Sequence, residues 1–197
     1  MPEAKQERSK KRIQTILETA ENILLDEGLD YLTIANIAKH SGLKRTSTYK
    51  FFPTPDSLKR ALILKYADDC SQYFKKRSSN INTENLSVVI LRCVEILYDY
   101  FQESRSSQII ILGNTITPPM DSSVMRLLAV NIQSFTESNI KLPGMHNKDG
   151  IYRVLTQIII SIFSLNIKEG GLLNETGKIE AHRAAHSYML NWVNHSS

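Results

Sequence analysis

Residues 33–52, TIANIAKHSGLKRTSTYKFF, decide the fold of this chain. They predict a short amphipathic helix, a turn at Gly42, where glycine ends a helix at little cost, and a second short helix rich in basic and hydroxyl side chains. Thr33 is placed to cap the first helix, because its hydroxyl can accept a hydrogen bond from a free backbone N–H. The apolar residues of the first helix recur at helical spacing and predict a buried stripe: Ile34, Ile37 and Ala38.

The second helix is too polar for a core element. It offers Lys, Arg, Thr, Ser and Tyr side chains, which suit the major groove of DNA, because base edges there present hydrogen-bonding groups between two rows of phosphates. Thr54 can cap a third element, and Pro55 stands at its first helical position, where a missing N–H costs nothing. Three helix boundaries in so short a span predict a helix-turn-helix DNA-binding unit.

This segment resembles the DNA-binding head of the TetR family of transcriptional regulators. The residues that match the family pattern in register are Thr33, Ile34, Ile37, Ala38, Ser41, Gly42, Leu43, Arg45, Ser47, Tyr49, Phe51, Phe52 and Pro53. An upstream apolar stripe, which stops at Gly28, is similar to the first helix of the family: Ile13, Ile16, Leu17, Ala20, Ile23 and Leu24. The resemblance covers about the first third of the chain, and the remainder matches in length and helical character only.

The resemblance implies an all-α fold with two parts. Residues 1–54 would form a three-helix helix-turn-helix head, and residues 55–197 a larger helical body for ligand binding and dimerisation. The chain departs from the family pattern at Lys44, where a capping Ser is usual, and at Thr46 and Thr48, which replace a common Gly and an aliphatic residue. These departures bear on the operator sequence.

The expected DNA contacts divide into two kinds. Arg45 and Thr46 are expected to reach base edges, with Lys44 either there or on a flanking phosphate. The residues expected mainly to bind phosphates are Thr33, Ser47, Tyr49 and Lys50. For Tyr49 the alternative is an ordinary core aromatic.

The distribution of charge supports a basic head. The chain has a net charge of +4, but residues 1–77 hold 15 Lys and Arg against 10 Asp and Glu, whereas residues 78–197 hold 9 against 10. The excess is densest near the N-terminus, at Lys5, Arg8, Lys10, Lys11 and Arg12. This arm could add phosphate contacts, or it could be a frayed, solvated terminus.

The remaining composition predicts a soluble cytoplasmic protein. The N-terminus is polar and charged and does not read as a signal peptide. The most apolar run, residues 158–167, is too short to span a bilayer. Two cysteines, Cys70 and Cys93, are too few for a disulfide scaffold and are expected to be buried thiols.

After the head, the sequence predicts helices throughout, and the last two are expected to contact a second subunit. Their apolar stripes are wide enough for both a core and a subunit contact, and in the resembled family two such helices pair with their copies in a four-helix bundle. The residues expected in a homodimer interface are Ile151, Leu155, Ile159, Ile162, His186, Met189, Trp192 and Val193. The alternative is that both stripes are intramolecular core.

A ligand cavity is expected in the body. Aromatic, Met and Cys side chains can line an apolar cavity with a few polar groups for orientation, and they predict a small, largely apolar ligand. The candidate lining residues are Tyr66, Cys70, Tyr73, Phe74, Cys93, Tyr98, Phe101, Met120, Met125 and Phe135. The same residues could be ordinary core.

Catalytic patterns are weak. His182 and His186 have the spacing of a two-histidine metal face, but the Glu of a zincin motif is absent between them. We therefore expect no catalytic residues, no metal and no cofactor. The sequence indicates a DNA-binding regulator, a repressor released from an inverted-repeat operator by a small molecule. The alternative is a helical ligand sensor that acts through a protein partner.

Overall fold

The computed structural model describes residues 2–79, 81, 83–113 and 122–195. Within these residues the regular secondary structure is helical, with no strand, which confirms the expected all-α class. The chain divides into two compact units, Met1–Ile63 and Leu64–Ser197, called here the head and the body. The division lies inside α4 (Pro55–Arg77) rather than before it, because the first turns of α4, with the buried Leu58 and Leu62, belong to the head.

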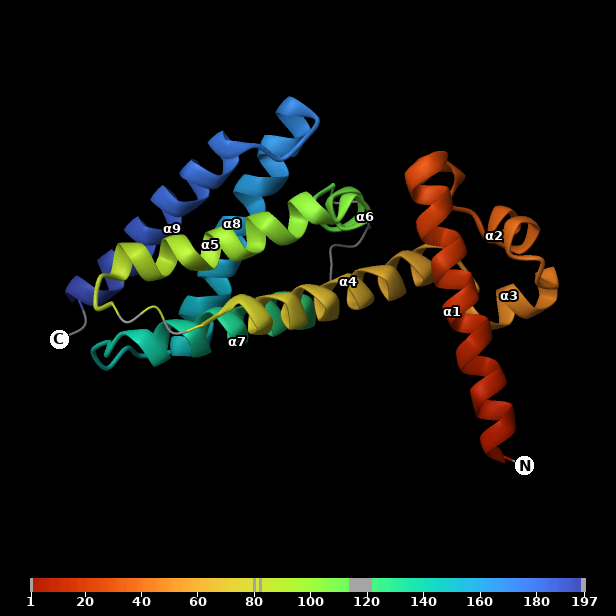
Figure 1. The fold of residues 1–197 in the computed structure, drawn as a ribbon, viewed down its shortest axis with the longest axis horizontal. Helices are drawn as coiled ribbons and strands as arrows, with labels where there is room; N and C mark the ends of the chain where they lie inside the picture. The colour runs from red at the N-terminus through yellow and green to blue at the C-terminus, as the bar shows by residue number, and fades with distance from the viewer. Residues whose placement is uncertain (1, 80, 82, 114–121, 196–197) are drawn as a thin grey trace. The chain divides into compact units, whose positions relative to one another are not determined.

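The head consists of α1 (Pro2–Asp26), a 3-10 turn (Leu29–Tyr31), α2 (Ile34–Ser41), α3 (Arg45–Phe51) and the start of α4 (Figure 1). Helix α1 packs against α2, and its apolar stripe, with the fully buried Ile16 and Ala20, forms the head's core. It ends before Gly28, whose φ of 92° lies in the region that glycine adopts without strain.

The turn between α2 and α3 has the geometry that the sequence predicts. The Thr33 hydroxyl accepts a hydrogen bond from the backbone N–H of Asn36 at 3.2 Å, and Gly42 ends α2 with a left-handed φ of 67°. Helix α3 begins after Lys44, which makes no side-chain capping bond. At the start of α4, the backbone N–H of Ser57 donates to the Thr54 hydroxyl at 3.1 Å.

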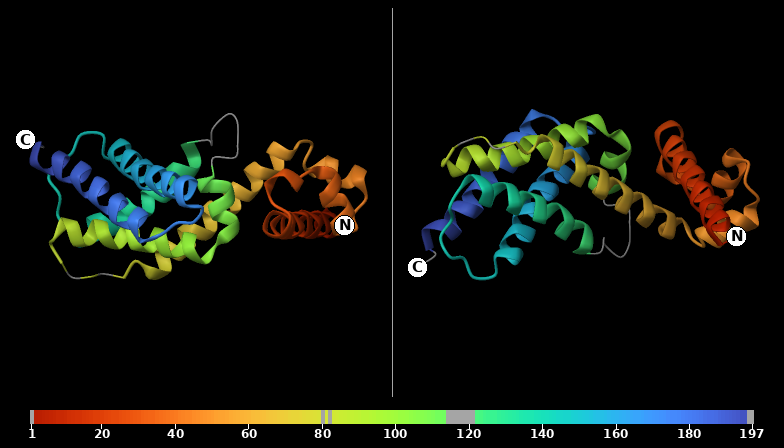
Figure 2. Two further views of the ribbon diagram at one scale, coloured as in Figure 1. Left: turned by 90° about the horizontal axis from the view of Figure 1, so that it is seen from above. Right: turned by 60° about the horizontal axis from the view of Figure 1, so that its bottom comes forward.

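The body contains α5 (Leu86–Glu103), α6 (Arg105–Ser107), a π-helical turn (Gln108–Leu112), α7 (Ser122–Asn139), α8 (Lys148–Gly170) and α9 (Glu175–His195), together with the rest of α4. Helix α8 packs against both α7 and α9, and α9 also packs against α5, as the views in Figure 2 show. Aromatic side chains join these helices: the rings of Phe101 on α5 and Phe163 on α8 lie edge to face, with centroids 6.3 Å apart.

Helix α8 is unusually apolar. Residues 154–167 carry no charged side chain, and α8 is long and apolar enough to cross a membrane by length and composition alone. A core helix of a soluble protein passes the same test, and 44% of the most apolar window is buried inside the body.

Both cysteines are buried, free thiols, as expected. Burial raises the pKa of Cys93 to about 12, which leaves its thiol protonated at neutral pH. These side chains pack as small apolar groups in the body's core.

The buried ring of Phe101 should contribute strongly to the stability of the body. Replacing this fully buried ring by Ala should lower the free energy of unfolding by about 3–5 kcal/mol, because a cavity replaces it. Urea unfolding followed by the fluorescence of Trp192, the one tryptophan of the sequence, measures this for the body. Val88→Ala on the same helix is the control, since Val88 is exposed and its loss should cost less than about 0.5 kcal/mol. Equal effects of the two substitutions would contradict the assignment of Phe101 to the core.

Candidate nucleic-acid interface

Helix α3 turns one face to the core of the head and the other to solvent. Thr48 is fully buried, and Phe52, just after the helix, is nearly so. The exposed face holds Arg45, Thr46, Tyr49 and Lys50, and Lys44 is exposed just before the helix. Ser47 lies at the edge of this face and is half-buried. The structure thus brings six predicted contact residues to one side of the head.

The positive charges of this face lack carboxylate partners in the part of the chain that the structure describes. Within the described residues, no ion pair involves Lys44, Arg45 or Lys50. Unpaired basic groups on a rigid, exposed helix attract phosphates and release the counterions that surround them.

Arg45 and Tyr49 form a pair one helical turn apart. The Arg45 guanidinium lies 5.5 Å from the centre of the Tyr49 ring, and Arg45 Nη2 donates a hydrogen bond to the Tyr49 hydroxyl at 3.4 Å. Tyr49 is exposed rather than part of the core, so its hydroxyl and ring are available at the surface. The ring and the hydroxyl of Tyr49 thus both contact the Arg45 guanidinium on the exposed face of α3.

Thr33 lies at the start of α2 and is half-buried. Its oxygen is occupied as an acceptor by the Asn36 N–H, whereas a hydroxyl keeps its own proton for donation. Thr33 can therefore cap α2 and donate to a phosphate at the same time.

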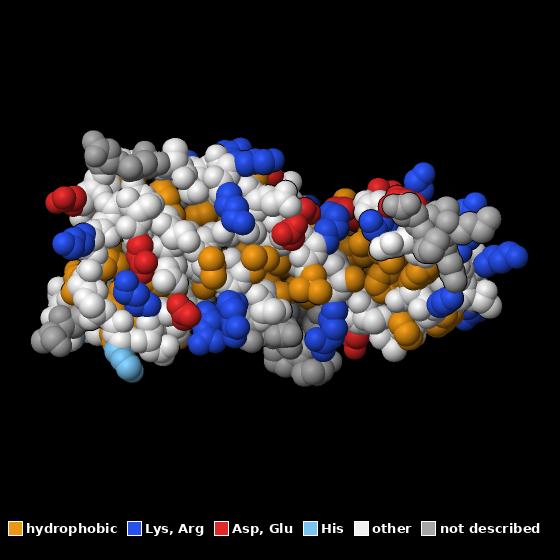
Figure 3. All heavy atoms as spheres, turned by 90° about the horizontal axis from the view of Figure 1, so that it is seen from below, with side chains coloured by type: hydrophobic (Ala, Val, Ile, Leu, Met, Phe, Trp, Pro, Cys, Tyr) orange, Lys and Arg blue, Asp and Glu red, His pale blue; other side chains and the backbone are white. Residues whose placement is uncertain are grey.

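Basic side chains also lie on α1. Arg8, Lys11 and Arg12 are exposed, and Lys10 pairs with Glu7 at 3.4 Å. The head lies in the right-hand part of Figure 3, where Lys and Arg side chains are visible on its surface. The Lys5 side chain lies outside the described residues.

The predicted ligand residues fall into three groups. Six are buried side chains of the body's core: Tyr66, Cys70, Phe74, Cys93, Phe101 and Phe135. Tyr73 and Tyr98 are half-buried, and the Tyr73 hydroxyl donates to the Glu103 carboxylate at 2.7 Å; partial burial and this carboxylate raise the pKa of Tyr73 to about 12. Met120 lies outside the described residues, and Met125 lines a groove of about 600 Å³ between α7, α8 and α9 that the sequence did not indicate.

Four predicted interface residues need correction. Ile151, Leu155, Ile159 and Met189 have at most 2% of their surface exposed in the single chain. Such side chains have no area left to bury against a second copy, so they belong to the body's own core. The others retain exposed surface: Ile162, His186 and Val193 are half-buried, and Trp192 is exposed.

The histidine pair of α9 is a packing feature. The rings of His182 and His186 stack with centroids 5.9 Å apart, and His182 Nε2 lies 3.2 Å from the Ser87 hydroxyl of α5. Burial, and then the neighbouring His182, lower the pKa of His186. Among the described residues, no group of three or more His, Cys, Asp or Glu side chains could hold a metal ion.

Comparison with known proteins identifies the fold. No family model and no curated protein matches the chain. Its fold matches that of a TetR-family transcriptional regulator from Streptomyces coelicolor with a TM-score of 0.68, at 14% identity over 92% of this chain and 99% of the other. A Shewanella sp. PV-4 protein assigned to the TetR family matches with a TM-score of 0.60, at 15% identity over 91% and 95% of the two chains. A Rhodococcus sp. RHA1 protein of unknown function matches with a TM-score of 0.61, at 16% identity over 92% and 95%. The chain therefore has the fold of TetR-family regulators, as the resemblance in the head implied.

The Thr33 cap should stabilise the α2–α3 arrangement measurably. Thr33→Ala removes the only side-chain acceptor that caps α2 in the described structure, and should cost about 1 kcal/mol of local stability. Hydrogen exchange of the α2 backbone amides measures this. Thr46→Ala is the matched control, because Thr46 is exposed on α3 and caps no helix. Unchanged exchange in Thr33→Ala would show that the cap does not stabilise α2.

Proposed function

We propose that this protein is a sequence-specific DNA-binding transcriptional regulator, a repressor in the cytoplasm that a small ligand releases from an inverted-repeat operator. The observation that carries the proposal is the exposed basic and hydroxyl face of α3, whose cations make no ion pair within the described residues, presented after a capped α2 and a left-handed Gly42. The fold of TetR-family regulators supports it.

Each side chain of the α3 face has a chemistry that suits one part of the duplex. The fork of Arg45 can donate two hydrogen bonds to guanine O6 and N7, and Thr46 can bond to either kind of base or contact a thymine methyl. Lys44 serves as a point charge for a base or a flanking phosphate. Ser47, Tyr49, Lys50 and Thr33 fix the register of the helix by donating to phosphates.

One helix of this length contacts few base pairs, too few for useful specificity. The proposal therefore includes a homodimer, which supplies two such helices. The outer surface of α8 is the surface that a second copy would cover. It carries an apolar face, defined by Val154, Ile158, Ile162 and Leu165, of which Val154 and Leu165 are 46% and 54% exposed. An apolar face without charges over residues 154–167 is costly in water and typical of a helix that is covered.

Release by a ligand requires a structural connection between the two units, and α4 is continuous from one unit into the other. Its first turns belong to the head, and its later turns carry Tyr66, Cys70 and Phe74 into the body's core. The buried Tyr100 hydroxyl of α5 donates to the Tyr66 carbonyl at 2.8 Å, which ties α4 to the core. A ligand that binds better to the DNA-incompetent state will weaken operator binding, and the operator must weaken ligand binding by the same factor.

The α3 assignment predicts two different mutational effects on an operator selected from a random DNA library. Arg45→Ala should cost about 1–3 kcal/mol of binding free energy and relax the preference at one base pair. Lys50→Ala should weaken all sequences similarly and reduce the slope of log Kd against log salt by about 1. Lys76→Ala, which removes an exposed charge from the part of α4 in the body, should leave both unchanged.

Electrophoretic mobility shifts at several salt concentrations give these values. A wild-type chain that selects no DNA sequence, while still binding a small ligand, would favour the alternative of a sensor that acts through a protein partner. Wild-type affinity in both α3 variants would mean that another helix contacts the operator.

The α8 face predicts the outcome of a charge substitution. Leu165→Glu should shift the dimer toward monomer, because a carboxylate would be buried without a partner. Leu172→Glu is the matched control: Leu172 is 55% exposed but lies after α8, outside the apolar face. Sedimentation velocity at micromolar concentration separates the species, and a monomeric wild-type chain would overturn the homodimer.

A further inference from the structure

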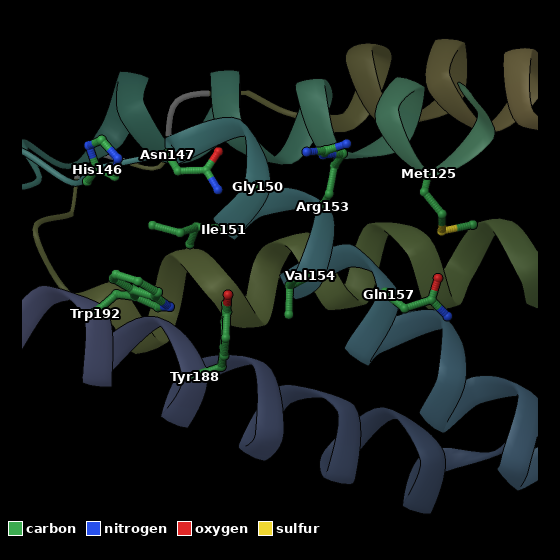
Figure 4. A pocket seen from close by; sticks show the side chains of 10 residues that line it. All are labelled: Met125, His146, Asn147, Gly150, Ile151, Arg153, Val154, Gln157, Tyr188 and Trp192. Atoms are coloured by element: carbon green, nitrogen blue, oxygen red, sulfur yellow. The ribbon is translucent and has the colours of Figure 1, made fainter. Parts of the chain in front are cut away.

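The body has a surface groove that takes no part in the proposed DNA contacts. It has a volume of about 600 Å³ and lies between α7, the segment before α8, the first turns of α8 and the last turns of α9 (Figure 4). Grooves and cavities of 300–1,000 Å³ are the usual size of small-molecule sites. All of its walls come from the body, so its shape does not depend on the placement of the head.

Apolar side chains from three helices line the groove. Ile151 and Val154 belong to α8, Tyr188 and Trp192 extend from α9, and Met125 extends from α7 (Figure 4). Aromatic rings and a thioether can pack on the faces and edges of a flat apolar ligand. The groove is therefore suited to a ligand with an aromatic or aliphatic body.

The polar side chains that line the groove carry no negative charge. They are His146, Asn147, Arg153 and Gln157, and the one permanent charge among them is the guanidinium of Arg153. Only Nε of Arg153 has a hydrogen-bond partner in the described structure, the carbonyl of Asp149 at 3.3 Å, and no carboxylate there lies within ion-pair distance. The terminal nitrogens of Arg153 are therefore available to an anionic group, which a guanidinium binds in a two-pronged geometry.

A second groove of about 230 Å³ adjoins the first at Arg153 and adds Arg126 of α7. Arg126 also makes no ion pair within the described residues. Asp149 lines this smaller groove but not the larger one. The larger groove is therefore lined by the positive charge of Arg153 and by no carboxylate.

We propose that the larger groove binds a small amphipathic anion, with an apolar or aromatic body on Tyr188 and Trp192 and one carboxylate-like group on Arg153. Of the ligand residues that the sequence indicated, Met125 lines this groove, whereas the six buried ones belong to the body's core. That this anion is the effector of a DNA-binding regulator rests on the proposed function. Binding of the anion to the groove does not depend on DNA. Val154 belongs to both the groove and the apolar face of α8, so a second copy is the competing occupant.

The single tryptophan makes the site directly observable. The probe is 1-anilinonaphthalene-8-sulfonate, an aromatic anion that accepts excitation energy from tryptophan, and N-phenyl-1-naphthylamine is the same probe without its charge. The anionic probe should bind saturably and quench Trp192 emission by energy transfer. Arg153→Gln should weaken this binding about tenfold, the effect of losing a charge-assisted hydrogen bond, and leave the neutral probe unchanged.

Two further variants keep the result interpretable. Arg153→Lys retains the charge without the fork and should lie between wild type and Arg153→Gln. Arg183→Gln is the matched control, because Arg183 is exposed on α9, pairs with Glu180 at 2.9 Å and does not line the groove. Circular dichroism and urea unfolding establish that each variant is folded.

Three results would overturn the proposal. The first is equal affinity of the anionic probe for wild type and Arg153→Gln. The second is saturation without a change in Trp192 emission, which would place the probe elsewhere. The third is binding only to the monomeric Leu165→Glu variant, which would make the second copy the occupant of the groove. None of these results concerns operator binding, so a failure here leaves the assignment of α3 in place, and a chain that ignores DNA could still bind the probe.

Discussion

The left-handed backbone at Gly42 is the constraint on which the head depends. With a φ of 67°, this residue ends α2 and lets the chain reverse into α3 within three residues, a conformation that costs a side-chain-bearing residue about 1 kcal/mol or more. The reversal places Thr48 inside while Arg45 and Tyr49 face solvent. A shift of α3 by one residue would turn its faces by about 100° and bury the charged groups. The turn thus selects which side chains DNA could meet.

The body depends on a different kind of constraint, the filling of its core. Helix α8 packs between α7 and α9, and its inward face carries Tyr152, Leu155, Ile159 and Phe163, each with no exposed surface. A helix this apolar also keeps Val154 and Leu165 at the surface, where about half of each residue is exposed. The same sequence property therefore supplies both the core and the surface that we propose for a second copy.

Two polar arrangements connect α4 to α5 at the edge of that core. The Glu103 carboxylate accepts from the Tyr73 hydroxyl and pairs with Arg77 at 3.3 Å, and the Arg77 guanidinium lies 4.5 Å from the centre of the Tyr73 ring. Exposed pairs of this kind contribute at most about 1 kcal/mol, so their role is orientation more than stability. The second arrangement is the buried hydrogen bond from the Tyr100 hydroxyl to the Tyr66 carbonyl, which links the two helices.

The sequence by itself determined the helical class, the α2–turn–α3 unit and the residues of its exposed face. These depend on local rules, namely a threonine cap, a glycine turn and a helical repeat, which act within a few residues. Only the tertiary structure decided which side of α8 and α9 is core: Ile159 and Met189 have the same apolar character as Leu165, and no local rule separates an inward apolar side chain from an outward one. The groove around Arg153 and Trp192 was equally out of reach, because its walls come from three helices that the chain separates by up to 67 residues between Met125 and Trp192. Their convergence follows from long-range packing, which a pattern along one helix does not contain.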